Sequence, residues 1–346
     1  MTTKIKIKDI ADELKISSTT VSFVINGKAK EKNISAAVAK KVLDLVAEWG
    51  YQPNSLAKSL RTGKSKIIGF LVDDISEPFF SRIARLIDEK ASEHGYKILF
   101  SSTRNNNEKA KELLQIFRDR HVDGYVIALP EGLEAEVERL IKTEVPVVLF
   151  DRYVPGMESD YVVTNNDESV FRATQHLVEN GYKNIGFVTI ETEQQQMLDR
   201  LLGYEKSIEE NGFKKSILKI EYKNSENSIK EITTFVKSNT KLDAVIFAAN
   251  YICMDGLRAF RQLDINSLNK IAVLSFDDFE LLEFYNPPIT AIAQPIEEIA
   301  ENIMKILLSK LNGNIKALEH KQVTLPALLN VRGSTLKRAK TKKEQL

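Results

Sequence analysis

From residue 66 to about residue 335 the sequence alternates short apolar runs with amphipathic helical patterns, and this alternation restricts the possible folds. Continuous apolar runs suit strands buried on both faces, and a helical pattern between consecutive strands is typical of βαβ units in parallel sheets. Eight strands are predicted, at residues 67–72, 97–101, 125–129, 147–150, 185–190, 218–222, 244–248 and 271–276. One five- or six-stranded sheet cannot hold them all, so we expect two α/β lobes that divide near residues 160–166.

Charge is distributed unevenly along the chain, although the whole sequence carries a formal net charge of only +1. Residues 1–66 contain 13 Lys and Arg against six Asp and Glu, the last eleven residues carry +4, and the body between them carries −10. A basic end on an acidic body is typical of a protein that meets a polyanion at that end. We therefore expect the first 66 residues to bind nucleic acid.

Cysteine and histidine usage excludes several protein classes. The single Cys253 cannot form an internal disulfide, and the four histidines (His94, His121, His176 and His320) show no metal-ligand spacing. The N-terminus lacks the apolar core of a secretory signal, and no stretch approaches the 18 apolar residues of a membrane span. We expect a cytoplasmic protein that uses no metal or other cofactor.

Residues 7–49 show helical spacing of apolar residues in three short segments, each too short to be stable alone, so we expect them to pack together. A tight connection at residues 14–16 precedes residues 17–20, all Ser or Thr, whose hydroxyls suit a helix N-cap and first turn. This order predicts a helix-turn-helix, and the alternative is a helical bundle in which these hydroxyls only cap a helix. The side chains expected on the exposed face of the second helix are Ser18, Thr19, Ser22 and Phe23.

The body lacks a complete catalytic motif. Residues 63–65 (Gly-Lys-Ser) resemble the end of a phosphate loop, but Lys58 stands where such a loop needs Gly and the segment precedes a strand. There is no GxGxxG after a strand and no GxSxG elbow. The adjacent acids at residues 73–74 and 277–278 have no evident partner for general acid–base work. We therefore do not expect an enzyme.

Polar side chains instead stand just past the carboxyl ends of several predicted strands, where open α/β sheets bind ligands. Carboxylates, amides and arginines beside aromatic rings suit a sugar, because its hydroxyls take paired hydrogen bonds while its C–H face packs on a ring. An Asp at a strand end is more often a turn former or helix cap, so each residue alone is ambiguous. The residues expected to converge there are Asp73, Asp74, Phe79, Phe80, Asp151, Arg152, Arg200, Asn250 and Asp277.

Several strings in the first 63 residues resemble, in order, the DNA-binding head and hinge of the LacI/GalR (lac repressor) transcription factors: residues 7–11, 17–22, 26–27, 34–35, 50–54 and 57–63. The resemblance implies that residues 17–22 read base edges in the major groove and that residues 53–61 form a hinge helix whose Leu60 wedges into the minor groove. The residues that it implies for DNA binding are Lys8, Ser17, Ser18, Thr19, Thr20, Ser22, Phe23, Asn26, Tyr51, Asn54, Ala57 and Leu60.

Two features of the head depart from the family's pattern. Phe23 stands where the family usually has an arginine that reads a base, so the bidentate contact of that arginine with guanine is missing and base specificity must differ. Residues 27–33, which lead to the third helix, form a longer connection than usual and are rich in lysine. These lysines either contact phosphates or form a solvated loop, and the sequence favours neither alternative.

The body is similar to the family's effector domain along nearly its whole length, a fold shared with periplasmic sugar-binding proteins. The similarity implies that the chain crosses between the lobes near residues 160, 290 and 322, so that a helix at 296–311 joins the first lobe and a strand at 323–331 joins the second. Glu77 stands where the family commonly has Asn, and an acid there would repel an anionic effector or bind a cationic group or hydroxyls. The effector contacts implied by the similarity are Asp74, Phe79, Phe80, Arg152, Arg200, Asn250 and Asp277.

The expected protein is a homodimeric repressor that binds a near-palindromic double-stranded operator under the control of a small effector, a carbohydrate. The tail lacks the leucine heptads of tetrameric relatives, which favours a dimer. Two alternatives are a sugar- or nucleoside-processing enzyme with a fused DNA-binding head and a periplasmic binding protein. The expected domains are a helix-turn-helix head (1–52), a hinge helix and linker (53–65), a two-lobed effector and dimerisation domain (lobe 1, 66–160 and 291–320; lobe 2, 161–290 and 321–335) and a basic disordered tail (336–346).

Overall fold

The computed structural model describes residues 5–51, 59, 62–263, 271–313 and 319–336. The chain forms two compact units, Met1–Ser65 and Lys66–Leu346. Apart from Ser59 and Leu336, the predicted hinge helix and the predicted disordered tail lie outside the described residues. Within the described part of the chain, no helix has the length and apolar content needed to span a bilayer.

The first unit contains three helices: α1 (Ile7–Glu13), α2 (Ser18–Ile25) and α3 (Ala36–Glu48). Hydroxyls fix the start of the second and third helices, because the Ser17 side chain accepts a hydrogen bond from the Thr20 backbone N–H and Ser35 accepts one from Val38. Helices this short depend on tertiary packing for their stability. Their shared core consists of the buried side chains Ile10, Ala11, Val21, Val24 and Val42.

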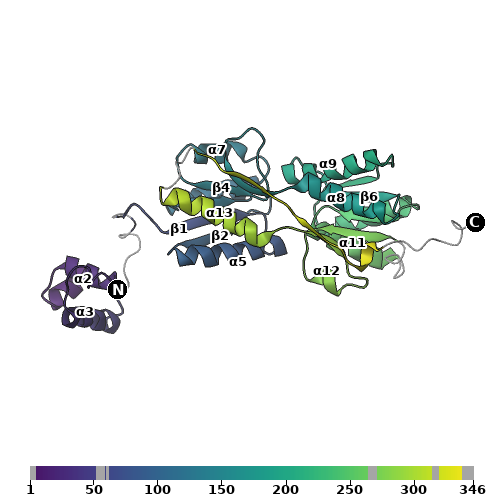
Figure 1. The fold of residues 1–346 in the computed structure, drawn as a ribbon. Coiled ribbons are helices and arrows are strands. Elements are labelled where there is room, and N and C mark those ends of the chain that lie inside the picture. The colour runs from purple at the N-terminus through teal and green to yellow at the C-terminus, as the bar shows by residue number, and fades with distance from the viewer. Residues whose placement is uncertain (1–4, 52–58, 60–61, 264–270, 314–318, 337–346) are drawn as a thin grey trace, which may run out of the picture. The chain divides into compact units, whose positions relative to one another are not determined.

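The second unit contains two six-stranded sheets, one in each lobe (Figure 1). The order in lobe 1 is β11-β5-β4-β3-β1-β2, and the order in lobe 2 is β12-β10-β9-β8-β6-β7. Neighbouring strands pair in parallel, except that β12 is antiparallel to β10. The strands of lobe 1 are β1 (Ile67–Val72), β2 (Lys97–Ser102), β3 (Gly124–Ile127), β4 (Val147–Phe150), β5 (Asp160–Thr164) and β11 (Gln322–Leu325). The strands of lobe 2 are β6 (Ile185–Ile190), β7 (Ile217–Ile220), β8 (Ala244–Phe247), β9 (Ala272–Phe276), β10 (Thr290–Ala293) and β12 (Leu328–Asn330).

Helices cover both faces of the first sheet. One apolar core lies between this sheet and helices α5 and α13, and a second core lies under α6 and α7. These helices are α5 (Pro78–Glu93), α6 (Asn107–Asp119), α7 (Glu134–Ile141) and α13 (Ile296–Leu311). Lobe 2 has one continuous core and the elements α8 (Asn166–Glu179), α9 (Gln195–Glu210), α10 (Ser225–Ser238), α11 (Asn250–Leu263), α12 (Leu281–Phe284) and the 3-10 turn η2 (Gly333–Thr335).

All eight predicted strands are present, with ends displaced by at most two residues, and the chain first leaves lobe 1 within the predicted division at 160–166. The crossovers that the resemblance implies, near 160, 290 and 322, each lie a few residues too early. β5 still pairs in the sheet of lobe 1, and β10 still pairs in the sheet of lobe 2. The predicted strand at 323–331 is wrong: its first part, β11, pairs with β5 in lobe 1, and its second part, β12, pairs with β10 in lobe 2. Each strand runs to its carboxyl end before the chain leaves the sheet, and Pro326, which has no N–H for a ladder, separates β11 from β12.

The first of the three crossovers is hydrogen-bonded to each of the other two. The Asn165 side-chain oxygen accepts from the Ala327 backbone N–H at 2.9 Å, and the Asn165 backbone N–H donates to the Leu325 carbonyl at 3.0 Å. The Thr164 hydroxyl donates to the Gln294 side-chain oxygen at 2.6 Å. The lobes are therefore joined by three segments, the first of which bonds to both of the others.

Candidate functional site

A cavity of about 650 Å³ is lined by segments from both lobes of the second unit. Lobe 1 contributes the segments after β1 and β4, and lobe 2 contributes those after β6, β8 and β9. The cavity therefore lies where the carboxyl ends of parallel strands face a ligand in this type of fold. It is lined by all seven residues predicted to contact an effector: Asp74, Phe79, Phe80, Arg152, Arg200, Asn250 and Asp277.

In lobe 1 the buried Arg152 lies between two carboxylates. Its guanidinium forms an ion pair with Asp73, and its Nε donates to Asp151 at 3.2 Å. Burial raises the pKa of the Asp73 carboxyl, although the charge of Arg152 opposes the shift. Asp151 adopts a positive φ of 67°, a strained backbone conformation that Asp tolerates better than most residues and that is frequent at functional sites.

In lobe 2 the buried Arg200, on α9, donates its hydrogen bonds to neutral groups, while the negative charge of Asp277 acts on it from nearby. Its Nε donates to the Asn166 side-chain oxygen and its Nη1 to the Ala248 carbonyl, both at 2.8 Å. The guanidinium carbon lies 3.5 Å from the centroid of the Phe276 ring, which is a cation–π contact. Arg200 was predicted to contact the effector, and two of its donors are bound within lobe 2.

Asp277 follows β9 and closes the lobe 2 side of the cavity. Its Oδ1 accepts from the Gln294 side-chain amide at 2.7 Å, and burial raises the pKa of its carboxyl. Gln294 also accepts a hydrogen bond from Thr164 at the first crossover, so its side-chain amide connects the cavity to the segments that join the lobes.

Glu77 bridges the cavity from lobe 1 to lobe 2. It is the N-cap residue of α5, and its Oε2 accepts from the side-chain amide of Asn250, the first residue of α11, at 2.7 Å. Burial raises the pKa of Glu77, and the nearby negative charges of Asp74 and Asp277 shift it in the same direction. Glu77 therefore adds negative charge to a site that already contains several acids.

Three of the predicted contacts also have local structural roles. The Asp74 carboxylate accepts from the Ser76 backbone N–H and hydroxyl at 2.9 and 2.8 Å, which is a turn and lowers the pKa of Asp74. Phe79 and Phe80 stack edge to face, with ring centroids 5.2 Å apart, and belong to the core of lobe 1. These residues support the cavity wall whether or not they contact a ligand.

The prediction missed several polar lining residues. Gln196 is buried, and its Oε1 has no hydrogen-bond partner among the described residues; the same holds for Nη1 of Arg152. Three consecutive glutamines, at residues 194–196, stand shortly after the predicted strand at 185–190. This run could have indicated a polar site. Tyr251, next to the predicted Asn250, and Tyr222, after β7, meet edge to face at 4.9 Å.

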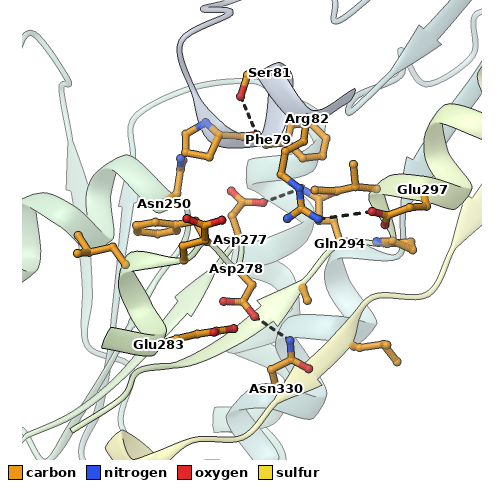
Figure 2. A pocket seen from close by; sticks show the side chains of 18 of the residues that line it. Phe79, Ser81, Arg82, Asn250, Asp277, Asp278, Glu283, Gln294, Glu297 and Asn330 are labelled. Atoms are coloured by element: carbon orange, nitrogen blue, oxygen red, sulfur yellow. Dashed lines mark hydrogen bonds and ion pairs between the residues drawn. The ribbon is translucent and has the colours of Figure 1, made fainter. Parts of the chain in front are cut away.

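A second cavity, of about 850 Å³, shares Phe79, Asn250, Asp277 and Gln294 with the first (Figure 2). Its lining includes the ion pair between Arg82 and Glu297 and the hydrogen bond that Asn330 donates to Asp278 (Figure 2). Among the described residues, no cluster of three or more His, Cys, Asp or Glu side chains could hold a metal ion. The first cavity is the candidate ligand site, because the predicted contacts converge there.

The head presents one polar face of α2. Val21 and Val24 are buried, whereas Thr19 and the C-cap Asn26 are exposed. Ser18, Ser22 and Phe23 are only partly exposed. The Ser17 and Thr20 hydroxyls lie 2.8 Å apart and hydrogen-bond each other, and Ser17 is the N-cap of the helix.

The remaining predicted DNA contacts lie on other parts of the head. Lys8 is exposed on α1, and Tyr51 is half-buried against the head core. Asn54, Ala57 and Leu60 lie outside the described residues.

Comparisons with known proteins cover both units. Residues 6–54 match the model of bacterial regulatory proteins of the lacI family, and residues 174–335 match a periplasmic binding protein-like domain. The chain is 30% identical over 334 residues to the HTH-type transcriptional regulator RegA of Clostridium saccharobutylicum, which covers 95% of this chain and 99% of the relative. It is 28% identical over 335 residues to catabolite control protein A of Priestia megaterium, with 96% and 99% covered.

A solved structure has the same fold as this chain. The crystal structure of the lac repressor dimer bound to operator and an anti-inducer matches with a TM-score of 0.83 at 22% identity, covering 96% of this chain and 100% of that chain. The helix-turn-helix head, the two-sheet body and the sequence relatives agree. The chain belongs to the LacI family of bacterial transcriptional regulators.

Proposed function

We propose that this protein is a cytoplasmic repressor whose operator affinity is controlled by a small carbohydrate bound between the two lobes. One observation carries the proposal: all seven predicted effector contacts line a single cavity to which both lobes contribute. A ligand in this position favours one angle between the lobes over another. Ligand and operator binding are then thermodynamically coupled, because each shifts the same conformational equilibrium.

Two buried polar atoms of the cavity-lining residues favour a polyhydroxyl ligand. Nη1 of Arg152 is a donor without an acceptor among the described residues, and Oε1 of Gln196 is an acceptor without a donor. A hydroxyl group both donates and accepts, so neighbouring hydroxyls of a sugar can satisfy both atoms. Tyr222 and Tyr251 supply aromatic surface for the sugar's C–H face.

Glu77 narrows the effector class further. Its carboxylate bonds to the neutral Asn250 amide, and the acids Asp74 and Asp277 lie nearby. The carboxylates of these acids would repel the phosphate of a phosphorylated sugar, whereas hydroxyls or an amine would not be repelled. We therefore propose a neutral or amine-bearing sugar.

At the DNA, we propose that two copies of the chain bind a near-palindromic operator. A two-fold dimer presents two equivalent recognition helices, so its preferred site repeats one half-site in inverted orientation. The exposed face of α2 enters the major groove, and the lysines of the head contact phosphates.

The test uses the purified full-length protein and an operator selected from a random DNA library. We expect an inverted repeat to be enriched, and we expect at least one neutral or amine-bearing sugar in a panel to change operator affinity while its phosphate ester does not. Each active sugar is recovered after incubation and should be chemically unchanged, since a regulator does not convert its effector. Absence of any sugar effect on operator affinity would contradict the proposed effector, and turnover would favour an enzyme.

A further inference from the structure

The outward face of α2 carries one large apolar side chain among small polar ones. One face of the helix carries, at helical spacing, Thr19, Ser22, Phe23 and Asn26. The buried Val21 and Val24 lie on the other side of the helix. Phe23 is only partly buried, so part of its ring belongs to this face. A phenyl ring has no donor or acceptor and cannot read a base by hydrogen bonds.

The lysine-rich connection after α2 folds back on this helix. The Lys28 backbone N–H donates to the Phe23 carbonyl at 2.8 Å, and the Ile34 N–H donates to the Ala29 carbonyl at 2.8 Å. Ala29 and Ile34 pack against the head core. The segment is therefore an ordered turn anchored at both ends.

This turn places a cation over the exposed ring. The Lys32 ammonium lies 5.5 Å from the Phe23 ring centroid, within the range of a cation–π contact. Lys32 also lies 3.3 Å from Glu31, but both side chains are exposed, and such surface pairs contribute little. Lys32 therefore holds a positive charge next to the Phe23 ring.

The major groove offers a phenyl ring one distinctive partner. The 5-methyl group of thymine is the apolar feature that distinguishes the base pairs there, and phenylalanine is among the side chains that contact it. Guanine and cytosine present hydrogen-bonding groups that the ring would leave unsatisfied. The chemistry at this position thus selects for the methyl group.

We infer that Phe23 reads the methyl group of one thymine in each operator half-site and that Lys32 is a positioning residue that orients the ring. The inference rests on the proposed entry of α2 into the major groove. It also assigns the turn at residues 27–33 to the DNA interface, an alternative that the sequence alone left open.

The test replaces thymine by deoxyuridine, which lacks only the methyl group, at each thymine of the selected operator in turn. For the full-length protein we expect one position per half-site where this change weakens binding about five- to ten-fold, the range of a single lost base contact. Phe23→Ala should bind both operators equally, whereas Phe23→Leu should keep the preference. Equal sensitivity of the wild type and Phe23→Ala to deoxyuridine at every position would overturn the inference.

Two lysine variants test the positioning role. Lys32→Met should reduce the thymine-to-deoxyuridine ratio, and Lys32→Arg should restore it, because Arg keeps the cation over the ring. Lys30→Met is the matched control, an exposed lysine of the same turn; it should weaken all operators alike and leave the ratio unchanged. If the library selection enriches no sequence, the proposed DNA function fails, whereas an enriched operator with no methyl preference overturns only the role of Phe23.

Discussion

Each lobe buries one arginine at the cavity, but the two lobes surround it with different partners. In lobe 1 Arg152 is paired with the carboxylates of Asp73 and Asp151. In lobe 2 Arg200 bonds to an amide and a carbonyl oxygen and stacks on a phenyl ring. The strands next to these arginines are equivalent: β4 and β9 occupy the same place in the strand order, and each is followed by an Asp with positive φ, 67° and 68°.

This difference separates a structural role from a binding role. The charge of Arg152 is balanced inside lobe 1, so removing it leaves buried carboxylates without a cation. The hydrogen-bond partners of Arg200 are neutral, and Asp277 acts on its charge without forming an ion pair with it, so a ligand oxygen can still take a charge-assisted hydrogen bond. We expect lobe 1 to contribute rigidity to the cavity and lobe 2 to contribute most of the charge-assisted binding.

The largest expected effect is on stability, from Arg152→Met. The free energy of unfolding should fall by about 3–5 kcal/mol, because Asp73 and Asp151 remain buried without their partner. Urea denaturation of the full chain at pH 7, followed by circular dichroism, measures the loss. Arg200→Met is the matched control, and it should lose about 1–3 kcal/mol because its partners are neutral groups. Equal losses in the two variants would remove the proposed difference between the lobes.

A smaller effect is expected on effector binding, from Arg200→Lys. Lysine keeps the charge but not the planar fork, so it cannot hold Asn166, the Ala248 carbonyl and a ligand at once. Calorimetry with the sugar found in the panel should show about ten-fold weaker binding, which corresponds to roughly 1.4 kcal/mol. Operator affinity without the sugar should not change. Unchanged sugar affinity would take Arg200 out of the ligand site.

The smallest effect concerns the bridge between the lobes, in Glu77→Gln. Burial raises the pKa of Glu77, so the folded state favours its protonated form; this stabilisation is complete below the unfolded pKa of about 4.3 and is lost as pH rises through the folded pKa. Glutamine mimics the protonated acid and can still accept from Asn250. At pH 7 the free energy of unfolding of the variant should therefore exceed that of the wild type, by less than about 1 kcal/mol because the group is partly exposed. Its melting temperature should be slightly higher.

The same variant has an internal control in pH. Near pH 4 the wild-type carboxyl is largely protonated, so the two melting temperatures should converge. Thermal melts between pH 4 and pH 7 measure the difference directly. A difference that grows toward low pH would show that the sign of the Glu77 contribution is wrong.

Apolar patterning predicted strands of any length whose residues are mostly apolar, including the four-residue β3, β4 and β8, but it did not predict β5, β10 or β11. β5 begins with the buried Asp160, which Lys310 neutralises from α13, 150 residues later in the chain. β10 and β11 have four residues each, and Gln and Thr occupy part of them. Their partners come from distant segments, so local patterning cannot reveal them, and the predicted crossovers shifted accordingly.

For the cavity, residue identities were easier to predict than residue partners. Strand ends placed Arg152, Arg200 and Asp277 correctly at the cavity, because the carboxyl ends of parallel strands meet there. The different roles expected for the two arginines depend on their partners, Asp73 for Arg152 and Asn166 for Arg200. These partners come from other segments of the chain, so local sequence does not reveal them. The hinge residues Asn54, Ala57 and Leu60 stay predictions.

The three crossovers also set the order in which the lobes can be completed during synthesis. Between residues 166 and 293 the ribosome delivers all of the lobe 2 sheet except its antiparallel edge strand, β12. Lobe 1 begins earlier but waits for α13, whose Ile299, Ile303 and Leu307 fill its core, and for the edge strand β11. The core of lobe 1 is therefore completed only after most of lobe 2 has been synthesised, and until then lobe 1 exposes an unfilled apolar face that is open to misassembly and to chaperones.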